Sequence, residues 1–299
     1  MNIKKFAAID IGSNAMRVLI SNVIETEEGV HFQKNALVRA PIRLGEDSFT
    51  LGEISKKSLK RMVNAMKAFK LLMKVHGVSH FQAYATSALR EANNSGDVVA
   101  LVKKKTGIKI EIIDGRKEAE IISKSKISDF LNTQKTFLLV DVGGGSSEFT
   151  FINSGKRVCS KSFKIGTVRL INELVDKRVW DAIRHWIVKN AKPYSKITLI
   201  GFGGNINKLF KLSNIRDGKP LSVIKLNQIF AELESINYEE RIVKFELNPD
   251  GADVIIPAAR IFLKALEWSG GQKIYVPKFG LSDGMIKYMY KQYKEMHKP

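Results

Sequence analysis

The chain contains one short pattern twice, at positions 131 residues apart. Residues 6–20, FAAIDIGSNAMRVLI, align without a gap on residues 137–151, FLLVDVGGGSSEFTF. Asp10 falls on Asp141 and Gly12 falls on Gly143. Two buried strands can resemble each other by chance, but the shared Asp-x-Gly in one register favours duplication over chance. The repeat therefore predicts two related halves that each open with the same strand–turn–strand hairpin.

The glycine run Gly143–Gly145 is predicted to form a tight hairpin turn. A Walker loop needs a lysine and a hydroxyl after its last glycine and then a helix, and Ser146-Ser147-Glu148 supplies no lysine. A dinucleotide fingerprint also needs a helix there, whereas Glu148–Ile152 is β-branched and aromatic, as a strand is. Backbone N–H groups in such a turn can form a nest for an anion. On this stretch alone, a plain structural hairpin is the equal alternative.

Strand and helix patterns alternate in both halves. The first half has strand patterns at 30–40, 81–86 and 108–113, and helix patterns at 58–76, 98–105 and from about 116. The second has strand patterns at 157–164, 197–201 and 274–276, and helix patterns at 168–189, 252–268 and 282–296. This order predicts two α/β domains: residues 1–124 joined by the C-terminal helix 282–299, and residues 125–281. The two hairpins are expected to face each other across a cleft.

The net charge indicates an anionic partner. Lysine and arginine number 49 against 30 aspartates and glutamates, a net charge of +19. Such an excess concentrates polyanions near a protein, so nucleic acid, an anionic membrane and a polyphosphate all fit. The alternative is a set of solvated helix faces, of which residues 56–57, 60–61, 67 and 70 are typical.

Other features of the composition exclude several classes of protein. The single cysteine, Cys159, cannot form an internal disulfide and suits a reducing compartment. The five histidines have no metal-ligand spacing. No uninterrupted apolar run approaches the ~20 residues that span a bilayer, and the apolar stretch near the start is too short for a signal peptide. A cytoplasmic location is therefore expected.

Several motifs, in their order along the chain, resemble the exopolyphosphatase and guanosine pentaphosphate phosphohydrolase (Ppx/GppA) family. The resemblance covers nearly the whole chain and implies two ribonuclease H-like domains of the actin-like ATPase superfamily, in the short two-domain form. Lys117, Glu120, Asn205 and Ser282 depart from the residues usual in the family, which affects the expected substrate preference more than the reaction type. The specific blocks are Asp10–Asn14, Ala85–Ala92 and Asp141–Glu148; the supporting ones are Gly115-x-x-Glu118-Ala119, Gly166–Leu170, Gly203-Gly204 and Gly280-Leu281-x-Asp283-Gly284.

The resemblance also implies roles for individual residues. Glu118 would be the general base that activates water, and Arg90 would contact phosphate. Mg²⁺ would lie between the phosphate and the carboxylates of Asp141, Glu148 and Asp10, although the two aspartates could instead bond their own turns. Arg17 and Arg169 are weaker phosphate candidates. The residues expected to bind phosphate through the two hairpin turns are Gly12, Ser13, Asn14, Gly143, Gly144, Gly145, Ser146 and Ser147.

The expected function is a metal-dependent exopolyphosphatase that releases terminal orthophosphate from inorganic polyphosphate, from guanosine pentaphosphate, or from both. One alternative is an ATP-dependent phosphotransferase of the same superfamily. Another is a non-catalytic polyanion- or alarmone-binding protein, although such a protein would gain nothing from Glu118 and the acidic hairpins. Neither nucleic acid nor a membrane is expected as a partner, and a homodimer is expected from the resemblance alone.

Overall fold

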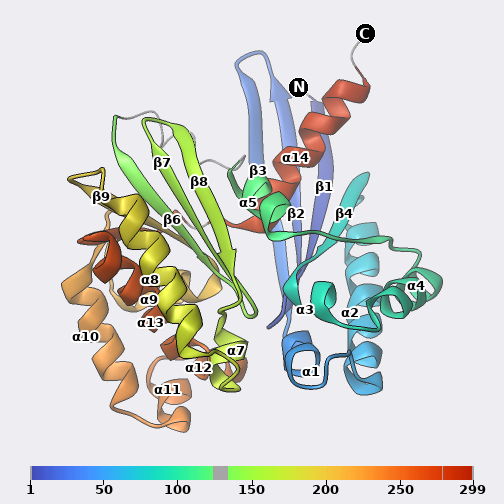
Figure 1. Cartoon of the computed structure of the whole chain (residues 1–299). Helices are drawn as coiled ribbons and strands as arrows, with labels where there is room; N and C mark the ends of the chain where they lie inside the picture. The colour runs from blue at the N-terminus through green and yellow to red at the C-terminus, as the bar shows by residue number, and fades with distance from the viewer. Residues whose placement is uncertain (1, 124–133, 278, 298–299) are drawn as a thin grey trace. The chain divides into compact units, whose positions relative to one another are not determined.

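The computed structural model describes residues 2–123, 134–277 and 279–297, whose helices and strands are shown in Figure 1. The chain divides into two compact units. The first is Met1–Lys126 together with Phe279–Pro299, and the second is Ile127–Lys278. The boundary predicted between residues 124 and 125 lies outside the described residues.

The first unit is built on a five-stranded mixed sheet of order β3-β2-β1-β4-β5. β1 pairs antiparallel with β2, and β2 antiparallel with β3, whereas β1–β4 and β4–β5 are parallel. This is the ribonuclease H-like arrangement that the resemblance implied. The strands are β1 (Asn2–Ile11), β2 (Met16–Thr26), β3 (Gly29–Ala40), β4 (His80–Ala85) and β5 (Ile110–Ile112).

Helices cover both faces of this sheet. The alternate β1 residues Ala7, Ile9 and Ile11 share one core cluster with the buried stripe Met62–Met73 of α2. On the opposite face the Phe6 ring meets Tyr290 of α14, with ring centroids 6.2 Å apart, and α14 packs on β1, β2, β4 and α5. The helices of this unit are α1 (Leu44–Thr50), α2 (Lys56–Val75), α3 (Ser87–Glu91), α4 (Ser95–Thr106), α5 (Gly115–Ser123) and α14 (Leu281–Met296).

The second unit repeats this sheet and adds one edge strand. Its order, β10-β11-β9-β6-β7-β8, read from β8 inward matches β3-β2-β1-β4-β5 followed by β10. The strands are β6 (Thr136–Val142), β7 (Ser147–Asn153), β8 (Lys156–Phe163), β9 (Ile197–Phe202), β10 (Leu221–Ser222) and β11 (Lys273–Tyr275). The helices are α7 (Thr167–Ile171), α8 (Lys177–Ala191), α9 (Gly204–Leu212), α10 (Val223–Glu234), α11 (Tyr238–Lys244), α12 (Pro249–Ala252) and α13 (Ile255–Ser269).

The two hairpins keep the 131-residue offset down to their pairing register. Asp10 lies opposite Arg17 in the first hairpin, and Asp141 lies opposite Glu148 in the second. The N–H of Gly12 donates to the Ala15 carbonyl at 3.1 Å, and the N–H of Gly143 donates to the Ser146 carbonyl at 3.0 Å. Matched register, turn closure and strand order confirm the prediction of two α/β halves that open with the same hairpin.

Two predicted helices are wrong in detail. The helix expected at 168–189 is two helices, because the chain breaks after α7 and restarts where the Asp176 carboxylate caps α8 by accepting from the Arg178 N–H. The helix expected at 252–268 begins only at Ile255 as α13, because the short helix α12 ends at Ala252. The short helices α1 and α3, with seven and five residues, were not predicted, since they are too short to show a 3.6-residue period.

Candidate functional site

The second hairpin turn is held from one side only. The carbonyls of Gly143 and Gly144 accept from the N–H groups of Thr167 and Val168 at 3.0 and 2.9 Å, and the Gly145 carbonyl accepts from Arg169 Nε at 2.8 Å. The C=O of one residue and the N–H of the next point in opposite directions across a planar trans peptide. The N–H groups of Gly144, Gly145 and Ser146 therefore point away from α7, and none has a hydrogen-bond partner among the described residues.

The first hairpin turn is held in the same way. The Ser13 carbonyl accepts from the Gly45 N–H at 2.8 Å, and the Asn14 carbonyl accepts from the Arg43 N–H at 3.0 Å. These donors belong to the start of α1, which follows β3 as α7 follows β8. In both units, N–H groups at the start of a short helix after the third strand thus bind carbonyls of the hairpin turn. The N–H group that follows each bound carbonyl in the turn then points away from that helix.

A glycine makes each of these close approaches possible. A Cβ on Gly166 would lie 2.4 Å from the carbonyl carbon and oxygen of Gly144, and one on Gly45 would lie 2.8 Å from the Ser13 Cβ. Neither position leaves room for a side chain unless the turn moves. Gly166 belonged to a recognised motif, whereas no pattern in the sequence marked Gly45.

The carboxylates at the two strand ends have different partners. Asp10 is buried and forms an ion pair with Arg17 at 3.0 Å; burial raises its pKa, against the opposing effect of the guanidinium. In the second hairpin the position equivalent to Arg17 is Glu148, which is also buried and accepts a hydrogen bond from Ser162 Oγ at 2.7 Å. Asp141 and Glu148 are thus two acids directly opposite each other on neighbouring strands, an arrangement in which like charges repel.

The remaining predicted residues of the first unit are linked by hydrogen bonds to its hairpin. Ser13 Oγ lies 2.9 Å from Ser87 Oγ at the start of α3. Arg90, on the same helix, donates from Nη1 to the Ile113 carbonyl at 2.8 Å. The next residue, Asp114, accepts from the Glu118 N–H at 3.0 Å. The structure therefore places the first turn, Arg90 and Glu118 along one connected edge of this unit.

The α5 helix, which carries Glu118, is packed closely against α14. A Cβ on Gly284 of α14 would lie 2.3 Å from the carbonyl oxygen of Ile121 in α5. Lys117, beside Glu118, pairs with Glu111 and lies with its ammonium 5.1 Å from the centre of the Tyr84 ring. Lys117 stands where the family usually has an acid, so a cation lies next to Glu118 in the chain. This ammonium group already contacts Glu111 and Tyr84.

In the second unit, a glycine brings α9 close to Asp141. Gly203 has a φ of 102° and precedes α9, and a Cβ there would lie 3.3 Å from Asp141 Oδ1. β9, which leads into α9, is parallel to β6, so the N-terminus of α9 lies at the sheet edge where Asp141 ends β6. Helix N-termini attract anions, which adds a second source of positive potential beside the turn.

Several side chains have roles that the sequence did not show. The hydroxyl of Ser147, expected to donate to phosphate, instead donates to the Ile165 carbonyl at 2.7 Å. The guanidinium of Arg169 is buried and supports the turn. Ser87 and Ser162, which reach Ser13 and Glu148, were not predicted. Contacts between residues so far apart in the chain have no local sequence signal.

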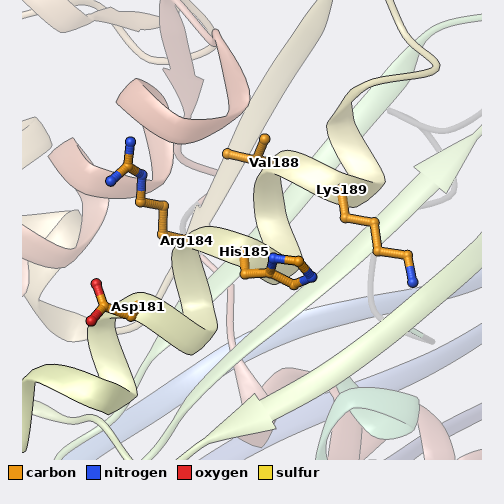
Figure 2. Close-up of a pocket in the computed structure, with 5 residues that line it drawn as sticks. All are labelled: Asp181, Arg184, His185, Val188 and Lys189. Carbon is orange, nitrogen blue, oxygen red and sulfur yellow. The ribbon is translucent and has the colours of Figure 1, made fainter.

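A shallow depression of about 530 Å³ lies along α8 in the second unit. Figure 2 shows that the side chains lining it spread from one helix rather than converging on one point. It contains none of the predicted site residues. Its lining is Asp181, Arg184, His185, Val188 and Lys189.

No group of three or more His, Cys, Asp or Glu side chains among the described residues is arranged to hold a metal ion. No helix in the described part of the chain is both long and apolar enough to cross a membrane.

Sequence comparison finds relatives over almost the full chain. The sequence profile of the Ppx/GppA phosphatase family matches residues 23–293. A bifunctional 3-dehydroquinate synthase/phosphatase of Fusobacterium nucleatum is 29% identical over 90% of this chain, which spans 44% of that relative. Exopolyphosphatase 1 of Mycobacterium leprae is 22% identical over 94% of this chain and 88% of its own length.

Solved structures show the same fold. A Ppx/GppA family member of Aquifex aeolicus is 25% identical with a TM-score of 0.76, over 99% of this chain and all of that chain. An exopolyphosphatase of Cytophaga hutchinsonii is 23% identical with a TM-score of 0.83, over 97% of this chain and 98% of that chain. Together with the sheet order described above, these likenesses confirm the expected fold class.

Proposed function

Because the chain belongs to the Ppx/GppA phosphatase family, we propose that it is an exopolyphosphatase that removes terminal orthophosphate from inorganic polyphosphate, guanosine pentaphosphate or both. Membership makes it a phosphoanhydride hydrolase. The proposal adds the substrate, the metal and the role of each residue.

The observation that carries the proposal is the one-sided anchoring of the second turn. Three consecutive carbonyls, those of Gly143–Gly145, are bound on the α7 side, so three consecutive N–H groups point the other way. Consecutive N–H groups with a common direction bind phosphate oxygens well. The N–H groups of Gly12 and Gly143 close their own turns, so the phosphate-binding donors are narrowed to Gly144, Gly145 and Ser146, and to Asn14 and Ala15 in the first turn.

The carboxylate pair of the second hairpin fits Mg²⁺. This ion prefers oxygen ligands, keeps several waters, and usually takes only one or two protein carboxylates together with substrate phosphates. Asp141 and Glu148 provide two such groups on one face of the hairpin. We assign the metal to Asp141 and Glu148 because they are two carboxylates directly opposite each other on one hairpin, whereas Asp10 lies opposite Arg17. The bound metal would offset phosphate charge.

Glu118 and Arg90 supply the remaining chemistry. Hydrolysis needs a positioned water, and a carboxylate at the start of a helix can accept its proton. The Arg90 backbone is fixed in α3 and its guanidinium is anchored at the Ile113 carbonyl, close in sequence to the start of α5. A planar guanidinium with further donors can contact phosphate while keeping that anchor.

The test compares phosphate release from four substrates under one Mg²⁺ concentration: long polyphosphate, tripolyphosphate, guanosine pentaphosphate and ATP. The proposal expects release from polyphosphate or guanosine pentaphosphate, with little from ATP, and loss of release when EDTA removes the metal. Transfer of phosphate from ATP to an added acceptor would favour the phosphotransferase instead. Tight binding of all four substrates without turnover would favour a binding protein.

A further inference from the structure

The basic charge of the chain is concentrated on two neighbouring helices. α2 and α4 together contain nine lysines, one arginine and one aspartate. They carry +9 of the total net charge of +19. The two helices pack side by side on the first sheet, and Lys70 of α2 joins them by donating to the Thr106 carbonyl at 2.6 Å.

These lysines lack the ionic partners that other surface helices have. Lysines and arginines of α11, α13 and α14 form ion pairs with nearby glutamates. No lysine of α2 or α4 forms an ion pair with a described residue. Like charges three or four residues apart on a helix destabilise it, and α2 contains such pairs as Lys56–Lys60 and Lys70–Lys74. A helix face that only has to be solvated could avoid this like-charge repulsion by mixing lysines with acids, as α11, α13 and α14 do.

The row of lysines begins at the same end of the first unit as the hairpin turn. β1 and β4 are parallel, and α2 precedes β4, so α2 runs back along the sheet and starts near the carboxyl end of β1. Arg61 confirms this placement by donating to the Pro41 and Ile42 carbonyls at 2.7 and 3.2 Å, next to Arg43, which binds the Asn14 carbonyl. α2 then extends for about 30 Å away from that end, with α4 packed against it.

The types of side chain exposed on α2 and α4 favour one kind of anionic partner over the others. Neither helix exposes an aromatic residue, since Phe69 of α2 is buried, so bases of a single-stranded nucleic acid have no ring to stack on. Leu71 and Val75 are exposed, but two aliphatic side chains at one end are too few for a helix to insert at a membrane interface. Lysine point charges without base-reading or lipid-inserting groups suit a continuous chain of phosphates.

We propose that α2 and α4 form an extended binding track for the distal part of a long inorganic polyphosphate whose terminal phosphate lies at the hairpin turn of the first unit. The proposal rests on the proposed function, which it extends from the terminal phosphate to the rest of the chain. Substrates too short to leave the turns would not use the track. The enzyme would therefore bind long chains better than short ones through contacts that take no part in the chemistry.

The test uses two variants of equal charge change. The track variant combines Lys56→Gln, Lys60→Gln, Lys67→Gln and Lys74→Gln, all at exposed positions of α2. The control combines Lys192→Gln, Lys196→Gln, Lys211→Gln and Lys219→Gln, which are exposed in the second unit and form no ion pair with a described residue. Glutamine has nearly the helix propensity of lysine, and circular dichroism checks that both variants fold.

The expected result is specific to chain length. In the track variant, the apparent KM and the dissociation constant for long polyphosphate rise on the order of tenfold at 0.1 M salt, because several phosphate contacts are lost. kcat and the KM for tripolyphosphate stay unchanged, and the control shifts less than about twofold in every measurement. Equal effects of the two variants, or equal effects on long and short substrates, would overturn the track.

Direct binding separates this proposal from the proposed function. Binding of long polyphosphate is measured by titration calorimetry without Mg²⁺, so it does not depend on turnover. Loss of long-chain binding in the track variant supports the track even if no polyphosphate is hydrolysed. Single-stranded RNA and phosphatidylserine vesicles are titrated in parallel. Loss of binding to either of these, with long polyphosphate binding unchanged, would overturn the proposal in favour of that partner.

Discussion

Glu118 shows how one residue depends on its position in a helix. It stands in the first turn of α5, with its N–H bonded to the Asp114 carbonyl, where a helix dipole favours a negative side chain. Local sequence alone predicts nothing more than that favourable placement. Its assignment as a base came from the family resemblance, which the sequence comparison confirms at the level of the family.

Replacing Glu118 by glutamine tests this assignment. We expect kcat to fall by about 10²–10⁴-fold, the usual contribution of a general base, with KM within a few-fold because the proposed phosphate contacts belong to the turns and not to Glu118. Glu120→Gln, on the exposed side of the same helix, is the matched control and should leave kcat near normal. Steady-state phosphate release checks both variants, and near-normal turnover of Glu118→Gln would remove this residue from the mechanism.

The two hairpins differ most at one pair of equivalent residues. Arg17 opposite Asp10 neutralises the acid within the protein, whereas Glu148 opposite Asp141 adds a second acid. The aligned sequences contain this exchange, but its meaning depends on cross-strand register, which only the structure shows. For this reason the sequence proposed all three acids as metal ligands, whereas the proposal made from the structure keeps Asp141 and Glu148 alone.

At the scale of elements, the anchoring of each turn by a short helix depends on a glycine. Gly166 has an extended backbone, with φ −157°, so alanine would be tolerated by the main chain and excluded by the turn itself, whose Gly144 carbonyl and Gly145 nitrogen would lie 2.4 and 2.5 Å from the added Cβ. We expect Gly166→Ala to displace the turn, to reduce kcat/KM by about 10²-fold and to cost about 1–3 kcal/mol of stability through overpacking.

The control for that variant is Gly96→Ala. Gly96 lies near the start of α4 with no atom within 4 Å of an added Cβ, so activity and stability should be unchanged or slightly improved. Phosphate release and thermal unfolding measure both variants. Normal activity of Gly166→Ala would show that the position of the turn does not control phosphate binding.

The packing of α14 around His80 is expected to make the stability of the first unit sensitive to acid. The His80 ring stacks on Phe6 with centroids 4.9 Å apart and meets Tyr293 of α14 at 4.8 Å. Burial lowers the pKa of His80, and His297 and Lys4 lower it further. The folded state thus disfavours the protonated ring. The contribution of neutral His80 to the free energy of unfolding is fully present above the ordinary histidine pKa of about 6.5, and it is lost as the pH drops below that value.

We therefore expect the unfolding temperature to decrease between about pH 7 and pH 5.5, and His80→Phe, which keeps an aromatic ring, to reduce that decrease. His185→Gln, on the exposed face of α8, serves as the control and should follow the unmodified protein. Thermal unfolding at several pH values gives the comparison. Parallel curves for all three proteins would exclude His80 as the source of the acid sensitivity.

The elements that the sequence predicted share one property. The hairpins, α2, β4 and α14 are long or strongly patterned, so their apolar period was visible, and their order sufficed for the two α/β halves. α1 and α3 are seven and five residues long, and they bond to the first turn through the Gly45 N–H and the Ser87 hydroxyl. These two helices escaped prediction, and α7 was predicted only as the start of a longer helix at 168–189. The turns themselves were predicted, because the repeated Asp-x-Gly marked them.

At the scale of the whole molecule, the net charge of +19 has an uneven distribution. Nearly half of it lies on α2 and α4, which make up a small part of the chain. A charge distributed for general solubility would act equally on substrates of any length. Contacts along an extended face act only on substrates that reach it, so salt should separate the two cases.

We expect the apparent KM of the unmodified enzyme for long polyphosphate to rise much more steeply with KCl than the KM for tripolyphosphate or guanosine pentaphosphate. The screening length falls from ~10 Å at 0.1 M salt to ~3 Å at 1 M, which removes the contribution of many exposed lysines. Contacts made by backbone N–H groups at a buried turn are direct hydrogen bonds and lose less. The measurement is the slope of log KM against log KCl concentration for each substrate. Equal slopes for long and short substrates would mean that the basic excess serves general solvation, and that substrate length is not read outside the hairpin turns.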